Sequence, residues 1–175
     1  DESGYDAGEN QQMKMAAIEA MWNTEPAPAS FTLFGIPDQE ARETKYAIHI
    51  PWVMGLIGTR SLTEPIAGIN QLEAQAEIRV RRGIIAYDAV ERLKVDRTDA
   101  AAREQFERHR LDLGYAMLLK RFVADPRTAT PDQIAQAAWT TVPNVPVMFW
   151  VFRVMAGLGF FFIAFFGTAF YFATV

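Results

Sequence analysis

The middle of the chain carries apolar residues at the spacing of amphipathic helices. Over residues 69–94 an apolar residue returns every three or four positions, and charged residues fill the places between. A similar stretch covers residues 99–122, and the short polar link between the two predicts an antiparallel helical hairpin. Thr130, Pro131 and Gln133 are typical of the N-cap, first and third positions of a further helix.

The N-terminal third has a more broken pattern. Residues 11–22 fit one helix with alanine and methionine side chains on a shared face. The two prolines within residues 25–29 exclude a helix interior there. Residues 31–38 form a short apolar extended segment, in which Gly35 and Pro37 argue against a long strand.

Two further segments lie before the long amphipathic helix. Residues 40–49 fit a short helix that Pro51 interrupts. Residues 50–58 are apolar but too few to span a membrane, so a buried helix and a helix at the membrane surface both suit them.

The end of the chain is an unbroken apolar run. Between Thr141 and Val175 the only charged residue is Arg153, and residues 154–175 contain none. About 20 apolar residues in a helix span a bilayer core of about 30 Å, so we predict a transmembrane helix. The chain starts without Met and stops inside the apolar run, and we therefore expect a segment of a longer protein. A C-terminal anchor on a soluble domain is the alternative.

Composition and charge narrow the function. The net charge of -4 argues against a nucleic-acid partner, which would call for a basic patch. The chain has no cysteine, and its two histidines, His49 and His109, form no metal-ligand pattern. It also has no phosphate-binding glycine loop, nucleophile elbow or zinc-protease motif, so nothing supports a stand-alone hydrolase or transferase.

Two pairs of residues are candidates for chemistry. Lys14 and Glu19 are five positions apart, about 140° around a helix, so both can border one pocket or be ordinary solvated charges. Arg153 and Met155 stand near the head of the apolar helix, about 200° apart. An ionisable group in a membrane helix suggests function, whereas near a helix end Arg can extend to the interface and Met can simply pack.

Longer motifs resemble one family over nearly the whole chain. The motifs are KMAAIEA (14–20), EPAPA (25–29), FTLFGIPDQ (31–39), AIHIP (47–51), GTRS (58–61), GY (114–115), LLKR (118–121) and FRVM (152–155). Together they resemble subunit I of the cytochrome bd-type quinol oxidases. The run from Lys14 to Gln39 is the most specific part of this resemblance.

The resemblance implies a fold class and a location. We expect a mainly α fragment of an integral membrane protein, with a helical extracytoplasmic loop domain and one transmembrane helix. Residues 1–64 are expected to form the N-terminal, quinol-binding part of the loop that the family calls the Q loop. Residues 65–143 would form its C-terminal helical part, and residues 144–175 the transmembrane helix. The parent would be a multi-pass protein of the bacterial inner membrane, with residues 1–143 in the periplasm.

The resemblance also implies a substrate and its site. The family oxidises ubiquinol or menaquinol and reduces dioxygen to water. By position, Lys14 and Glu19 match residues that bind and oxidise quinol, with Glu19 as a proton acceptor. Asp1 and Arg60 match polar positions close to the quinol.

Haem cofactors and protein partners follow from the same resemblance. Met155 matches the axial methionine of the low-spin haem b, and Arg153 matches a basic residue near that haem. A high-spin haem b and haem d would lie elsewhere in the subunit. The expected partners are the rest of subunit I, subunit II, quinol and lipid. Because the histidine opposite Met155 would lie on another helix, we expect the segment alone to be inactive. A membrane-anchored helical interaction module without a redox role is the alternative.

Overall fold

A computed structural model describes residues 11–27, 29–54 and 65–174. The chain forms two compact units, one of residues 1–69 with 143–175 and one of residues 70–142. The described residues are mainly helical, as predicted, and include one helix able to span a membrane. The division into two loop parts and a membrane helix stays a prediction.

Helix α2 (Gln12–Glu19) opens the first unit and confirms the predicted N-terminal helix. It buries Ala16, Ala17, Ile18 and Glu19. The helix ends earlier than predicted because Ala20 takes a left-handed conformation, with φ 50° and ψ 40°. The N–H of Met21 then bonds back to the carbonyl of Ala16 at 2.9 Å, which satisfies the helix end.

Strands β1 (Phe31–Asp38) and β2 (Glu43–Ile50) form an antiparallel hairpin, in which Phe31 pairs with Ile50. The predicted helix over residues 40–49 is therefore wrong, and so is the expectation that no long strand forms.

The pairing of the two strands explains why Gly35 and Pro37 do not prevent a long strand. Both strands of a two-stranded sheet are edge strands, where proline is tolerated, and Pro37 pairs with Thr44. A Cβ at Gly35 would lie 2.6 Å from Cγ2 of Thr44, so glycine permits the close approach of the two strands. Irregular register on either side of Phe34 accommodates the remaining mismatch.

Residues 51–54 directly follow the hairpin. Met54 is buried and Trp52 is 63% exposed. Residues 55–58 of the apolar segment predicted over residues 50–58 lie outside the described residues. A bridge between Glu25 and Ile66 ties the segment before α4 to the segment after α2.

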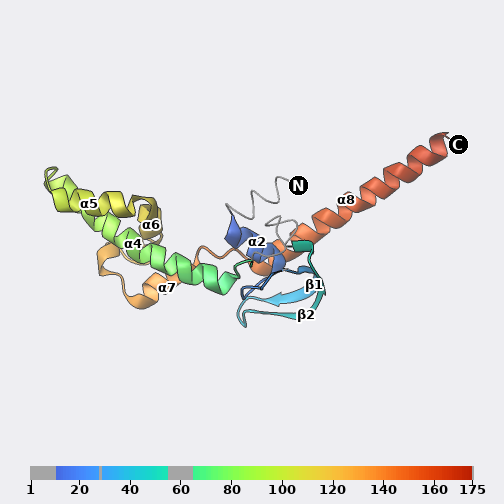
Figure 1. The fold of residues 1–175 in the computed structure, drawn as a ribbon, viewed down its shortest axis with the longest axis horizontal. Coiled ribbons are helices and arrows are strands. Elements are labelled where there is room, and N and C mark those ends of the chain that lie inside the picture. The colour runs from blue at the N-terminus through green and yellow to red at the C-terminus, as the bar shows by residue number, and fades with distance from the viewer. Residues whose placement is uncertain (1–10, 28, 55–64, 175) are drawn as a thin grey trace. The chain divides into compact units, whose positions relative to one another are not determined.

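Helix α8 (Val145–Thr174) is the predicted membrane helix. Its 30 residues extend about 45 Å. Pro146 lies inside its first turn, where proline is well suited to the first helical positions. Figure 1 shows that only the first turns of α8 meet α2 and β1, while the rest projects away. Phe160 and Phe172 on this projecting part are about three-quarters exposed, at 75% and 76%.

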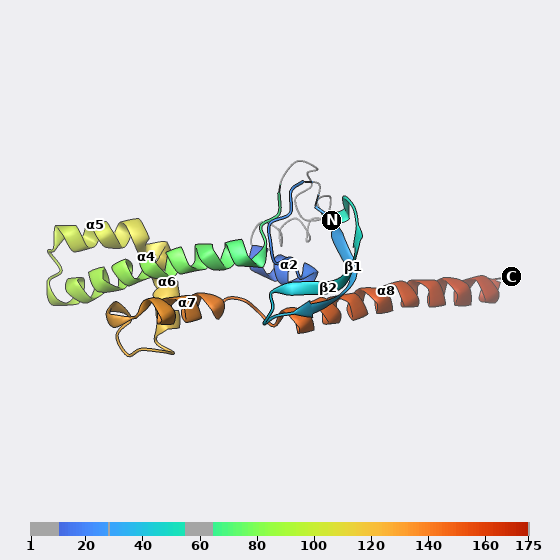
Figure 2. The same ribbon diagram turned by 90° about the horizontal axis from the view of Figure 1, so that it is seen from below.

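The second unit is entirely helical in its described structure (Figure 2). It contains the α-helices α4 (Ile69–Val95), α5 (Ala100–His109), α6 (Leu113–Leu119) and α7 (Pro131–Trp139), with the 3-10 turns η1 (Arg110–Asp112) and η2 (Pro126–Thr128). Its core consists of Val80, Leu119, Ile134 and Ala137. The long helix and the antiparallel hairpin are confirmed.

The helix predicted over residues 99–122 is broken at η1. At this point the backbone passes very close to α4, where a Cβ at Gly83 would lie 2.4 Å from the carbonyl oxygen of Asp112. Arg79 of α4 also bonds the Asp112 carboxylate at 2.7 Å. These contacts with α4 fix the break, so a local pattern cannot foresee it.

The predicted start of α7 is confirmed. The side chain of Thr130 accepts a hydrogen bond from the N–H of Gln133, and the Gln133 side chain accepts one from the N–H of Thr130. Pro131 occupies the first turn. This reciprocal pair satisfies N–H groups that the start of α7 would otherwise leave unpaired.

Candidate functional site

Glu19 is the one carboxylate buried in the first unit's described core. It is the last residue of α2, directly before the left-handed turn at Ala20, and it is 2% exposed. Its Oε2 atom accepts a hydrogen bond of 2.9 Å from the backbone N–H of Thr32 in β1. The end of α2 therefore presents a carboxylate to the edge of the hairpin.

Arg153 reaches the same place from α8. Its side chain is 10% exposed. Its N–H groups donate to five acceptors of this chain: Nε to the carbonyl of Leu33 (3.1 Å), Nη1 to the carbonyls of Ile18 (2.7 Å) and Phe149 (3.0 Å), and Nη2 to the Glu19 carboxylate (3.4 Å) and the carbonyl of Thr32. A guanidinium has five N–H groups, so every donor of Arg153 is used.

Aromatic rings enclose the guanidinium. The Cζ atom of Arg153 lies 3.4 Å from the ring centroid of Phe149 and 5.4 Å from that of Phe31. Phe149 is fully buried. The rings shield the ion pair from water and add a cation–π contact, which strengthens as the cation is desolvated.

The surroundings of Glu19 bring the pKa of its carboxyl close to neutral pH. Burial raises the pKa of the Glu19 carboxyl from 4.5 to about 7. The N–H of Thr32 and the charge of Arg153 oppose the rise without cancelling it, and the charge of Glu25 adds to it. A carboxyl with this pKa can accept and release a proton at physiological pH.

The other predicted site residues are placed differently. Lys14 is exposed on α2, and the structure does not bring it to the Glu19–Arg153 pair. Met155 is 61% exposed on α8, whereas Arg153 turns inward, in line with the predicted 200° separation. Asp1 and Arg60 lie outside the described residues.

Two further residues of the site were not foreseen. Thr32 holds the Glu19 carboxylate through its backbone. The side-chain amide of Gln39 accepts from the N–H of Val145 at 3.0 Å and donates to the carbonyl of Pro143 at 3.4 Å, so it caps the start of α8. Both lie within the family-like motif at residues 31–39, but their bonding partners are set by the fold.

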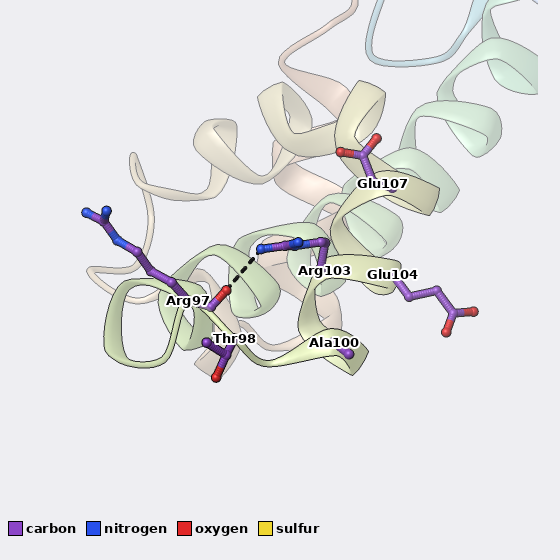
Figure 3. Close-up of a pocket in the computed structure, with 6 residues that line it drawn as sticks. All are labelled: Arg97, Thr98, Ala100, Arg103, Glu104 and Glu107. Carbon is purple, nitrogen blue, oxygen red and sulfur yellow. Dashed lines mark hydrogen bonds between the residues drawn. The ribbon is translucent and has the colours of Figure 1, made fainter.

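The second unit has a hollow of its own, shown in Figure 3. Arg97, Thr98, Ala100, Arg103, Glu104 and Glu107 line it around the start of α5. Arg103 bonds the carbonyl of Arg97 at 3.1 Å. None of the predicted site residues lines it. Among the described residues, no group of three or more His, Cys, Asp or Glu side chains could hold a metal ion.

Comparison with known proteins decides the family. The family model for cytochrome bd terminal oxidase subunit I matches residues 1–175. The chain belongs to the cytochrome bd terminal oxidase subunit I family. It is 35% identical over 159 residues, 91% of its length, to cytochrome bd-II ubiquinol oxidase subunit 1 of Escherichia coli (strain K12). It is 29% identical over 69 residues, 39% of its length, to cytochrome bd ubiquinol oxidase subunit 1 of Bacillus subtilis (strain 168).

The family match confirms the resemblance on which the site was predicted. The matched regions cover 31% of the Escherichia coli protein and 15% of the Bacillus subtilis protein, so the chain spans less than a third of these relatives. The roles of Lys14, Glu19, Arg153 and Met155 stay predictions.

Proposed function

We propose that this segment supplies the quinol site and one axial haem ligand of a respiratory quinol oxidase. The observation that carries the proposal is the burial of Glu19 against Arg153 where α2, β1 and α8 meet. Quinol oxidation releases two protons with two electrons, and a carboxylate with a pKa of about 7 is suited to accept one of them.

Lys14 complements Glu19 from the solvent-facing side of the same helix. Its ammonium group is exposed and carries three N–H donors, which suit a quinol oxygen as it loses its proton. Lys14 thus binds and orients the quinol, and Glu19 takes the hydroxyl proton. The proposed quinol site therefore includes both Lys14 and Glu19 of α2.

Met155 suits the haem part of the proposal. Its thioether is 61% exposed on a helix whose apolar face is uncovered, so it is open to a flat apolar group such as low-spin haem b. When bound, that haem would accept electrons from quinol, and the Met155 thioether would hold its iron and favour the reduced state.

Arg153 fits a different role from the one expected beside the haem. All five of its N–H groups already have acceptors in this chain, so a bond to a haem propionate would require one of them to be exchanged. Its contacts support a positioning role, in which it holds Glu19 and β1 on the first turns of α8.

The same proposal covers the intact protein. The parent subunit would oxidise ubiquinol or menaquinol and reduce dioxygen to water, with a high-spin haem b and haem d elsewhere in the subunit and subunit II as partner. It would lie in the bacterial inner membrane, with α8 in the bilayer and residues 1–143 in the periplasm. Taken alone, the segment would be inactive.

The test is a pair of variants in the intact oxidase, Lys14→Ala and Glu19→Gln. We expect Lys14→Ala to raise the KM for quinol and Glu19→Gln to abolish quinol oxidation, while oxygen consumption from an artificial electron donor continues. Glu40→Gln, at an exposed carboxylate of the hairpin turn, is the matched control and should behave as the unmutated protein. Normal quinol oxidation by both test variants would remove Lys14 and Glu19 from the site.

A further inference from the structure

One face of the β1–β2 hairpin is apolar and exposed. Phe34 pairs with Ile48 across the hairpin, and Ile36 and Ile50 each stand two positions further along their strands, so the four side chains share this face. They are between 39% and 56% exposed. The face continues onto α8 at Trp150, whose ring lies 5.4 Å from that of Phe34 in an edge contact. A contiguous exposed apolar surface of this kind marks an interaction site.

The hairpin runs alongside the first turns of α8 (Figure 2). At its turn, the side chain of Gln39 accepts a hydrogen bond from the N–H of Val145, the first residue of α8. At its open end, the carbonyl of Leu33 accepts one from Nε of Arg153 at 3.1 Å. Val145 and Arg153 are eight residues apart, which is about 12 Å along the helix axis. The open end of the hairpin therefore lies deeper along α8 than the turn.

Arg153 marks the depth at which α8 enters the hydrocarbon core. It is the last charged residue of the chain, and α8 is long and apolar enough to cross a membrane. A charged group is costly inside the core, and Trp150, one turn earlier, belongs to a residue type that favours the membrane–water interface. Leu33 is bonded to Arg153, so the open end of the hairpin lies at this interface.

The charges of the hairpin follow the same direction. Asp38, Glu40, Glu43 and Lys45 all lie at or beside the turn, where Lys45 bonds the Asp38 carboxylate at 3.2 Å. Towards the open end, residues 31–37 and 46–50 contain no Asp, Glu, Lys or Arg. The hairpin thus has a charged end at the level of water and an apolar end at the level of the interface.

We propose that the apolar face of the hairpin, formed by Phe34, Ile36, Ile48 and Ile50, rests on the surface of the lipid bilayer beside α8. An apolar face at the boundary of headgroups and acyl chains is stabilised by the apolar area that the lipid covers. The apolar face then holds the open end of the hairpin in lipid, while the turn stays in water.

The two sides of α8 favour lipid over protein as the partner. Arg153 points to the hairpin, and Met155 points about 200° away around the helix. A haem bound to Met155, with the helix that carries its second ligand, would therefore lie on the side of α8 opposite the hairpin. This step rests on the proposed function, because it takes Met155 as the haem ligand.

The contact deepens the proposed quinol site. Glu19 is held by the N–H of Thr32 in β1, next to Leu33, so it lies close to the same depth as the apolar face. A quinol with an apolar tail is dissolved in the bilayer. The hairpin would thus keep the proton acceptor at the level where the substrate meets the protein.

The experiment measures the surroundings of single nitroxide spin labels on the intact oxidase in phosphatidylcholine–phosphatidylglycerol nanodiscs. The labels are attached at Ile48→Cys and Ile50→Cys, and at Glu40→Cys in the exposed turn as the matched control. The chain has no cysteine of its own, and reactive cysteines elsewhere in the oxidase are replaced first. Power saturation then compares collisions with oxygen, which concentrates in lipid, and with a nickel chelate, which stays in water. Quinol oxidation by the labelled proteins checks that they are folded.

We expect the ratio of oxygen to nickel collisions to be several-fold higher at residues 48 and 50 than at residue 40. Nickel access at residues 48 and 50 as high as at residue 40 would place the face in water and overturn the proposal. Low access to both reagents would show that protein covers the face, which would also overturn it.

The haem spectrum of Met155→Leu separates this inference from the proposed function. Labels covered by protein, together with loss of the low-spin haem b bands, would refute the lipid contact alone. Labels in lipid, together with unchanged haem bands, would support the lipid contact and refute the proposed haem ligand.

Discussion

The Oε2 atom of Glu19 lies 3.4 Å from Nη2 of Arg153, although 134 residues separate them in the sequence. The pair joins α2 to α8, two residues before Met155. The proposed proton acceptor and the proposed haem ligand are thus connected through one ion pair and two residues of helix. A substitution of Glu19 or Arg153 should therefore affect both the proposed proton acceptor and the proposed haem ligand.

The raised pKa of Glu19 predicts how stability depends on pH. A carboxyl whose pKa is higher in the folded state favours folding when it is protonated. This contribution is complete below pH 4.5 and is lost as the pH rises through about 7. Glu19→Gln mimics the protonated form, so we expect its free energy of unfolding to gain about 3 kcal/mol on the unmutated protein between pH 4 and pH 8. Thermal unfolding of the intact oxidase at several pH values measures this, and a constant difference would contradict the assigned pKa.

Arg153→Ala should strongly destabilise the packing where α2, β1 and α8 meet. It leaves the Glu19 carboxylate buried without its partner and removes the donor from four backbone carbonyls. We expect a loss of about 3–5 kcal/mol. Arg153→Lys keeps the charge but not the five planar donors, so its loss should be smaller yet clear. Limited proteolysis of the hairpin, together with thermal unfolding, reports the effect. Equal resistance to proteolysis in Arg153→Ala and the unmutated protein would show that the hydrogen bonds of Arg153 are not needed to hold the hairpin.

Met155→Leu tests the haem ligand. Leucine keeps the size and apolar character of the side chain but has no sulfur to bind iron. A reduced-minus-oxidised spectrum of the intact oxidase should show specific loss or shift of the low-spin haem b bands, with the other haem bands retained. Val151→Leu, at a position as exposed as Met155 on the same helix (both 61%), is the matched control and should leave all bands in place. Unchanged low-spin bands in Met155→Leu would reduce Met155 to a packing residue.

Gln39 should fix the start of α8. Gln39→Ala removes both the acceptor for the N–H of Val145 and the donor to Pro143, and we expect a loss of about 1–2 kcal/mol. Gln39→Glu keeps the acceptor and places a negative charge near the helix N-terminus, so most of the stability should remain. Hydrogen exchange at the first turn of α8 distinguishes the two variants. Equal exchange rates in Gln39→Ala and the unmutated protein would show that the cap contributes nothing.

Gly83 and Gly114 make a matched pair in the second unit. A Cβ at Gly83 would lie 2.4 Å from the carbonyl oxygen of Asp112 and 2.8 Å from the amide nitrogen of Ala116, both backbone atoms. A Cβ at Gly114 would meet no atom within 4 Å. We expect Gly83→Ala to cost about 1–3 kcal/mol and Gly114→Ala to be neutral or stabilising by up to about 1 kcal/mol. Thermal unfolding of the two variants provides the comparison, and similar stability would contradict the close approach of α4 to residues 112–116.

Several elements were predictable because their signals are local. The stripe of apolar residues in α4, the cap of Thr130 and Gln133 in α7, and the uncharged run of α8 each depend on residues within a few positions of one another. The resemblance to one oxidase family was also visible in short motifs, and the family match confirmed it.

The hairpin and the break after α5 depended on distant partners. Residues 40–49 have enough helical character to suggest a helix, but pairing with β1 satisfies their backbone as a strand. At η1 the contact with Gly83 and Arg79 of α4 overrides a helical pattern. Propensity is a weak preference, and tertiary contacts of this kind outweigh it.

The sequence by itself determined the helices α4 and α7 and the apolar helix α8, because spacing and capping residues along the chain fix them locally, and its motifs determined the family. Only the tertiary structure decided that Glu19 is buried against Arg153, while Lys14 and Met155 remain exposed. A charged side chain takes its partner and its pKa from the groups that folding brings around it. For Glu19 and Arg153 those groups are backbone carbonyls and N–H groups from α2, β1 and α8, which no local pattern joins.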